Sequence, residues 1–254
     1  MSGLAVFLGP TLPREDAERE LDAAYLPPVA QGDIIRLCSR DEKPKAIGIV
    51  DGLFENVPSV WHKEILFAIS QGIAVFGASS MGALRAAELH PFGMIGVGAI
   101  FEAFRDGRLE DDDEVAVIHG PAELGYTGLS EAMVNIRRTL ADAVVDEVIP
   151  AETARQLEGI AKALPYRERG YGRVLRLAAD RGVPEEELAD LKLWLPTGRF
   201  DQKREDARQM LRAMRRWAAQ GAVAPEARFH FERTVLWEKA VRESASLATG
   251  PEIR

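Results

Sequence analysis

Short apolar runs alternate with segments of helical composition in the first half of the chain. The apolar runs cover residues 3–8, 34–37, 46–50, 73–76 and 115–118, and all but the second end in a glycine or proline turn signal. The segments between them include helical patterns over residues 13–25, 60–71 and 83–89. This alternation is typical of βαβ units with a mostly parallel sheet. We therefore predict an α/β fold for the first half.

The pattern becomes purely helical in the second half. Apolar residues recur at helical spacing over residues 129–144 and again over residues 207–217. No strong strand pattern occurs between residues 126 and 221. We predict two domains, an α/β core domain over residues 1–125 and a helical C-terminal region over residues 126–254 that packs on it.

Charge is distributed unevenly between these two halves. Residues 1–125 contain 10 basic and 20 acidic residues, whereas residues 126–254 contain 22 basic and 20 acidic residues. Mixed charge on helices is usually a solvated surface, but the arginine-rich half is also suited to docking an acidic partner protein. The net charge of −8 argues against a protein that coats nucleic acid.

Composition also excludes several kinds of site. A lone cysteine, Cys38, rules out an internal disulfide scaffold and a cysteine-rich zinc site. No histidine pair has zinc-binding spacing and no phosphate-binding P-loop occurs, so we expect no metal and no cofactor. No apolar run reaches the ~18 residues of a membrane span, and the N-terminus lacks a basic signal-peptide region. We expect a cytoplasmic protein without membrane contact.

Residues with reactive side chains occur where several of the predicted strands end. Ligands of open α/β sheets bind at the carboxyl ends of the strands. Three of these ends carry reactive side chains: Asp51, Ser79 with Ser80, and His119. We therefore expect a site at this edge of the sheet.

The segment from Gly77 to Gly82 joins a predicted strand to a predicted helix. A nucleophile elbow needs small residues two positions before and after its nucleophile, and Ser80 meets this requirement better than Ser79 because Met81 follows Ser79 by two. The helix start also offers backbone N–H groups for an oxyanion. The alternative is that Ser80 is only the helix N-cap, although the glutamate of a capping box is missing.

A serine nucleophile needs a base. His119, at a predicted strand end, and His62, at the start of a predicted helix, are the two candidates, and a desolvated Lys63 is an alternative. Asp51 either orients the base or satisfies the turn before Gly52. The residues predicted to contact substrate are Gly77, Ser79, Gly82, Arg85, Glu88 and Lys63.

Longer motifs in this region resemble a known family. The runs SMGALRAAEL and DDDEVAVIHGPAE, within a block from about residue 47 to residue 126, are similar to TfuA-like proteins, as is FLGPTL near the start. The resemblance continues into LSEAMVNIRRTL and covers roughly the first 140 residues.

The resemblance implies a function in peptide backbone thioamidation, in the biosynthesis of ribosomal peptide natural products. It implies a YcaO enzyme as partner and a ubiquitin-like sulfur carrier of the ThiS type, whose thiocarboxylated C-terminus is hydrolysed to release sulfide. Cleavage of such an acyl donor needs a nucleophile, a base and an oxyanion site, which agrees in kind with the residues above. Two alternatives stay open: a non-catalytic scaffold, and a sulfur shuttle that carries a persulfide on Cys38.

Overall fold

A computed structural model describes residues 3–53, 57–121, 123, 126–221 and 223–248 of the chain. Two compact units emerge, one formed by residues 1–108 and 206–254 and the other by residues 109–205. This division differs from the predicted boundary at residue 125, because the chain returns to the first unit. Asp206 accepts a hydrogen bond from the backbone N–H of Ile100 at 2.8 Å, which ties the returning segment to the first unit.

The first unit contains a five-stranded sheet in which neighbouring strands are parallel, in the order β2-β1-β3-β4-β5. The strands are β1 (Leu4–Phe7), β2 (Ala24–Leu26), β3 (Ala46–Ile49), β4 (Ala74–Gly77) and β5 (Ile95–Gly96). Phe7 pairs with Ile49, and Ile49 pairs with Gly77. The three central strands thus end level with one another, so the segments that follow them begin at one edge.

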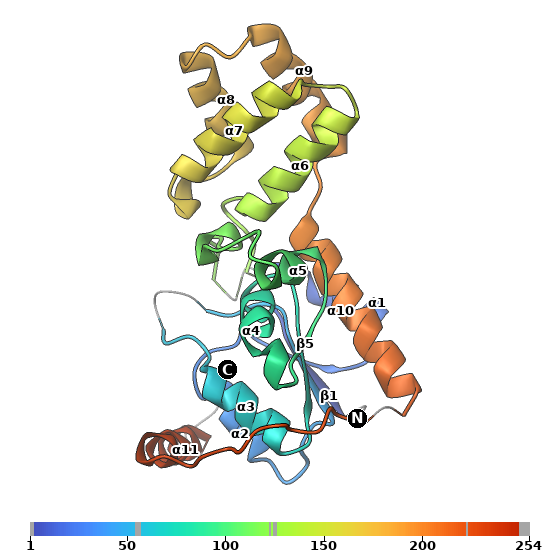
Figure 1. The fold of residues 1–254 in the computed structure, drawn as a ribbon, viewed down its shortest axis with the longest axis vertical. Helices are drawn as coiled ribbons and strands as arrows, with labels where there is room; N and C mark the ends of the chain where they lie inside the picture. The colour runs from blue at the N-terminus through green and yellow to red at the C-terminus, as the bar shows by residue number, and fades with distance from the viewer. Residues whose placement is uncertain (1–2, 54–56, 122, 124–125, 222, 249–254) are drawn as a thin grey trace. The chain divides into compact units, whose positions relative to one another are not determined.

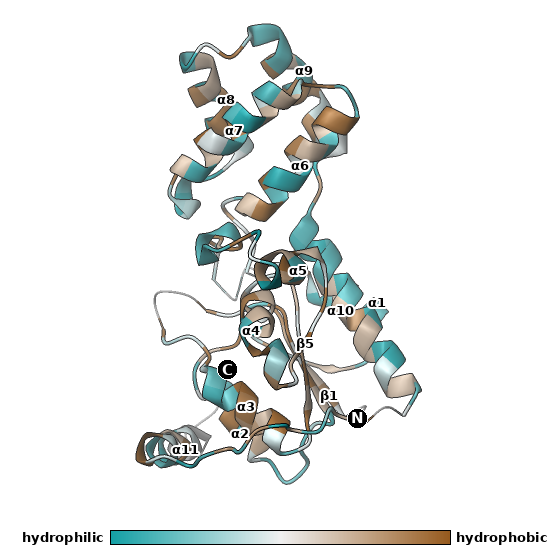
Figure 2. Ribbon diagram, in the orientation of Figure 1, coloured by the Kyte–Doolittle hydropathy of each residue, from teal (hydrophilic) through white to brown (hydrophobic). Residues whose placement is uncertain are grey.

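Helices cover both faces of this sheet (Figure 1). The helices that lie wholly or mainly in this unit are α1 (Arg14–Glu20), α2 (Asp33–Cys38), α3 (His62–Ser70), α4 (Met81–Leu89), α5 (Ala99–Arg105), α10 (Gln202–Ala219), α11 (Val235–Ala248) and the 3₁₀ turn η1 (His90–Phe92). Helix α10 packs closely on one face because Gly48 has no side chain. A Cβ there would lie 2.7 Å from Met214 Sδ and 2.9 Å from Met210 Cε. Figure 2 shows the strands mostly in hydrophobic colours, as expected for a sheet covered on both faces.

The second unit is helical. It contains α6 (Met133–Val145), α7 (Ala151–Ala163), α8 (Tyr171–Asp180), α9 (Glu185–Gly198) and the 3₁₀ turns η2 (Asp112–Glu114) and η4 (Tyr166–Glu168). Its core includes Met133, Ile136, Leu157, Ile160 and Leu191, all nearly inaccessible to solvent. The predicted fold class, a mostly parallel sheet with flanking helices followed by a helical half, is therefore confirmed.

Two predicted strands are wrong. Residues 34–37 lie in the helix α2, and residues 115–118 join no strand of the sheet. The first error arises because α2 is almost wholly buried, so its apolar run has no polar face to reveal the helical period. The short strands β2 and β5 were not predicted, since two or three residues carry too little pattern to be recognised.

None of the helices in the described part of the chain combines the length and the apolar character that crossing a membrane requires.

Candidate functional site

Asp51 follows β3 at the edge where the central strands end, and it is only 2% exposed. Its Oδ2 accepts hydrogen bonds from the backbone N–H groups of Gly9 at 2.9 Å and Thr11 at 3.2 Å. Its Oδ1 accepts a 2.6 Å hydrogen bond from Thr11 Oγ1. The carboxylate therefore fixes the loop after β1 to the end of β3. Thr11 was not singled out from the sequence, since its approach to Asp51 depends on the pairing of β1 with β3.

Ser79 lies on the sharp turn between β4 and α4 and is completely buried. Its φ of 68° is in the left-handed region, which non-glycine residues rarely adopt. Its Oγ donates to Thr11 Oγ1 at 3.4 Å, the long end of the hydrogen-bond range. Ser79, Thr11 and Asp51 thus form a chain of two hydroxyls ending on a carboxylate. Strained backbone of this kind is a feature of the nucleophile elbow.

Ser80 occupies the N-cap position of α4, yet its side chain makes no capping hydrogen bond. Several backbone N–H groups at the start of the helix nevertheless have acceptors. Gly82 N–H donates to Val50 O at 3.3 Å, and Ala83 N–H donates to Ser80 O at 2.9 Å. Within the described part of the chain, the backbone N–H of Met81 has no acceptor. One donor at this helix start is therefore free for an anionic group.

Gly77 and Gly82 allow α4 to approach the sheet. A Cβ on Gly82 would lie 1.8 Å from Ile49 O, and a Cβ on Gly77 would lie 2.2 Å from Gly82 O. Both distances are far inside van der Waals contact. The two glycines predicted to contact substrate therefore have a packing function, which is to make the strand-to-helix turn sterically feasible.

His62, Arg85 and Glu88 form a separate polar cluster on α3 and α4. His62 Nε2 lies 2.7 Å from Glu88 Oε2, and Arg85 Nη1 donates to the same oxygen at 2.7 Å. Burial opposes ionisation of Glu88, but the hydrogen bonds from His62 and Arg85 outweigh it and lower the pKa of Glu88. Arg85 Nε also donates to Val60 O at 3.2 Å. The His62 imidazole is thus bound to Glu88, and Ser79 contacts the Thr11 hydroxyl instead.

The contacts described for Lys63 and His119 are with residues other than Ser79. Lys63 Nζ donates to Thr234 Oγ1 at 3.2 Å and lies over the Phe231 ring, 5.5 Å from its centroid. His119 belongs to the second unit, where its Nδ1 lies 2.8 Å from Gly120 O and its ring packs against Tyr126. The prediction that His119 ends a strand of the sheet is wrong, because the residues before it form no strand there.

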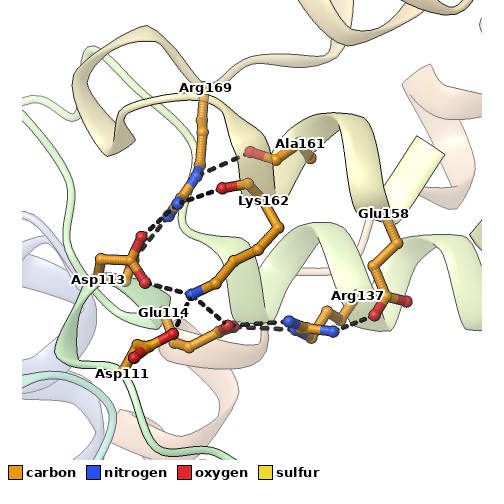
Figure 3. A network of polar contacts seen from close by, with 8 residues as sticks. All are labelled: Asp111, Asp113, Glu114, Arg137, Glu158, Ala161, Lys162 and Arg169. Atoms are coloured by element: carbon orange, nitrogen blue, oxygen red, sulfur yellow. Dashed lines mark hydrogen bonds and ion pairs between the residues drawn. The ribbon is translucent and has the colours of Figure 1, made fainter. Parts of the chain in front are cut away.

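An ion-pair network in the second unit was missed from the sequence (Figure 3). The Lys162 ammonium contacts three carboxylates, lying 2.9 Å from Asp111 Oδ2 and 2.9 Å from Glu114 Oε1 and bonding Asp113 as well. The Arg169 side chain is wholly buried and also pairs with Asp113. Glu114 itself is 2% exposed. The acidic run 110–114 therefore contains a buried carboxylate that is held by cationic side chains.

The cationic side chains of this network explain how its carboxylates can lie close together. The oxygens of Asp111, Asp113 and Glu114 lie within 4.8 Å of one another, close enough to hold a metal ion. However, Lys162 already supplies a positive charge among them. Burial opposes ionisation of Asp113 and Glu114, but hydrogen bonds from cationic side chains outweigh it and lower both pKa values. In this arrangement the three carboxylates form ion pairs with Lys162, so we assign them a structural role.

Cys38 is buried in α2 at 1% exposure. Burial raises the pKa of its thiol to about 12. A thiolate is the reactive form of cysteine, and it is scarce at neutral pH under these conditions. The buried thiol argues against the sulfur-shuttle alternative.

Comparison with known protein families matches residues 51–170 to the family described as TfuA-like protein. The resemblance inferred from the sequence is thereby confirmed. No curated protein matches the chain. The matched segment includes Asp51, Ser79, Ser80 and the whole ion-pair network of Figure 3, whereas Thr11 lies before it.

Proposed function

We propose that this chain, a TfuA-like protein over residues 51–170, releases sulfide from a thiocarboxylated ThiS-type carrier for a YcaO enzyme that thioamidates peptide backbones. The family supports a role in a thioamidation pathway. The carrier, the YcaO partner and the hydrolytic step are implied by the family resemblance and are part of the proposal.

The hydrogen-bonded chain from Ser79 through Thr11 to Asp51 is the observation that carries the hydrolytic step. It starts at the strained turn of the strand-to-helix segment and ends on a buried carboxylate. Such a chain offers the serine proton a path to Thr11 as the Thr11 proton moves to Asp51. The geometry therefore favours Ser79 over Ser80 as the nucleophile, while Met81 N–H offers a hydrogen bond to the oxyanion.

In the proposed reaction, Ser79 Oγ attacks the carbonyl carbon of the carrier thiocarboxylate and loses its proton to the chain. The carbon–sulfur bond breaks, and sulfur leaves with a proton as hydrosulfide. Water then attacks the serine ester, which restores the Ser79 hydroxyl and frees the carrier as a carboxylate. Because Ser79 is fully buried, the turn must open to admit the carrier C-terminus.

A non-catalytic adaptor is the second candidate, and the same burial favours it. Asp51 accepts three hydrogen bonds from the loop after β1, so its carboxylate also has a sufficient structural function. Under this alternative, the chain brings the carrier to the YcaO enzyme, and the serines hold the turn.

The test is sulfide release from purified thiocarboxylated carrier by this protein alone, with the intact mass of the carrier measured afterwards. Hydrolysis predicts sulfide together with a carrier of carboxylate mass, and loss of release in Ser79→Ala. Ser80→Ala tests the nucleophile predicted from the sequence. Ser70→Ala, at the end of α3, is the matched control. Thioamide formation only after YcaO is added, with no release by the protein alone, would instead establish the adaptor.

A further inference from the structure

A cavity of about 560 Å³ lies in the first unit beside α2. Its walls come from the ends of β1 and β2, from α2 and from α11, and they include Phe7, Leu26, Arg36, Arg40 and Ser244. This volume is within the range of small-molecule sites. Thr11, Asp51 and Ser79 do not line the cavity. It is therefore a feature separate from the serine turn.

The cavity lining carries two cationic side chains, Arg36 and Arg40, and one carboxylate, Asp33. Ser244 is 5% exposed, and its hydroxyl has no hydrogen-bond partner in the described residues. Arg40 forms no ion pair with any described carboxylate, whereas Arg36 pairs with Asp33. Two guanidinium groups thus face a single carboxylate, and the excess positive charge favours an anion.

Gly32 lies beside two of these polar side chains. A Cβ on Gly32 would lie 2.9 Å from Ser244 Oγ and 3.0 Å from Arg36 Nη1, so the hydroxyl and the guanidinium lie close together beside this glycine. The φ of +89° at Gly32 also favours glycine. Two polar groups from different helices are therefore neighbours in the cavity lining.

The lining also includes apolar side chains. Phe7, Leu26 and Leu37 contribute hydrocarbon surface to the same cavity. A ligand that fills the volume and contacts both kinds of side chain needs an apolar body and a negatively charged head. Inorganic anions would leave the apolar side chains uncovered, and a neutral hydrocarbon would form neither an ion pair with Arg40 nor a hydrogen bond with Ser244.

We propose that this cavity binds a small amphiphilic anion, with the anionic head on Arg40 and Ser244 and the apolar body against Phe7 and Leu26. The head group is a carboxylate or a phosphate, since a guanidinium binds both. The proposal is independent of sulfide release, because its test measures binding alone.

Calorimetric titration of the full chain with octanoate, octyl phosphate and octanamide tests the proposal. We expect one of the two anions to bind at one site, about tenfold more tightly than octanamide, since one charge-assisted hydrogen bond has about this effect. The stronger of the two anions identifies the head group. Equal affinity for the anions and the amide, or no binding of either anion, would overturn the proposal.

Variants locate the binding to this cavity. Arg40→Gln is expected to weaken the better anion about tenfold and to leave octanamide unchanged. Ser244→Ala is a second variant that keeps the charge. Arg176→Gln, an exposed arginine of α8, is the matched control and should bind as the unchanged protein does. Anion affinity that is the same in Arg40→Gln and Ser244→Ala as in this control would show that the cavity is not the site.

Discussion

Thr11 Oγ1 lies 2.6 Å from Asp51 Oδ1, and this hydrogen bond joins the loop after β1 to the end of β3 across 40 residues of sequence. It also places a hydroxyl between the buried carboxylate and Ser79. This hydrogen bond therefore has two roles. It fixes the loop after β1 to the end of β3, and it completes the proposed proton path from Ser79 to Asp51.

Asp51→Asn should therefore destabilise the protein strongly. The amide has one oxygen where the carboxylate has two, so part of the donor set of Gly9 and Thr11 is left buried and unsatisfied. We expect a loss of about 2–3 kcal/mol in the free energy of unfolding, measured by urea denaturation. Asp41→Asn, at an exposed position, is the control. Equal stability of the two variants would contradict the assigned role of Asp51.

Ser79 and Ser80 should respond differently to substitution by glycine. Ser79→Gly relieves the positive φ and should raise stability by about 0.5–1 kcal/mol, while abolishing sulfide release if Ser79 is the nucleophile. Ser80 has a φ of −116°, outside the left-handed region, so Ser80→Gly relieves no positive φ. Urea denaturation of both variants checks the prediction. A destabilised Ser79→Gly together with an unchanged Ser80→Gly would show that the turn is not strained.

Cys38 should be inert in the folded protein. Burial raises the pKa of its thiol to about 12, so an alkylating reagent at pH 8 should modify it only after unfolding in urea. The sign of the pH dependence follows from this shift. The unfolded thiol ionises near pH 8.5 and the folded one near 12, so its contribution to stability is complete below about pH 8.5 and is lost as pH rises towards 12. Rapid alkylation of the native protein would refute this prediction.

The Lys162 network should make the second unit sensitive to acid. The cationic partners lower the pKa values of Asp113 and Glu114, so their stabilising contribution is present above the ordinary carboxyl pKa of about 4 and is lost as pH falls below it. Lys162→Met should cost about 3 kcal/mol at pH 7, because it leaves three carboxylates without their shared cation. Its loss of stability from pH 7 to pH 2 should be smaller than that of the unchanged protein, and the difference should arise below about pH 4.

Urea denaturation across this pH range measures both effects. Lys192→Met, at an exposed lysine of α9, is the matched control for the loss of one positive charge. If Lys162→Met and Lys192→Met had the same stability and the same pH dependence, the network would not stabilise the unit.

The sequence by itself predicts the elements whose pattern is local. The apolar runs of β1, β3 and β4 predict buried strands, and the spacing in α3, α4 and α6 predicts helices. The rule that ligands bind where parallel strands end brings Asp51 and Ser79 to the same edge without any coordinates. Where the local pattern is ambiguous, as in the buried helix α2, the prediction fails.

Tertiary structure decides which side chains meet. The partner of Asp51 is Thr11, the partner of His62 is Glu88, and Lys162 reaches an acidic run about 50 residues earlier. None of these pairs has a spacing that marks it, because long-range contacts depend on strand register and helix packing. Local periodicity determines which face of an element is buried, but only the assembled core determines what lies opposite that face.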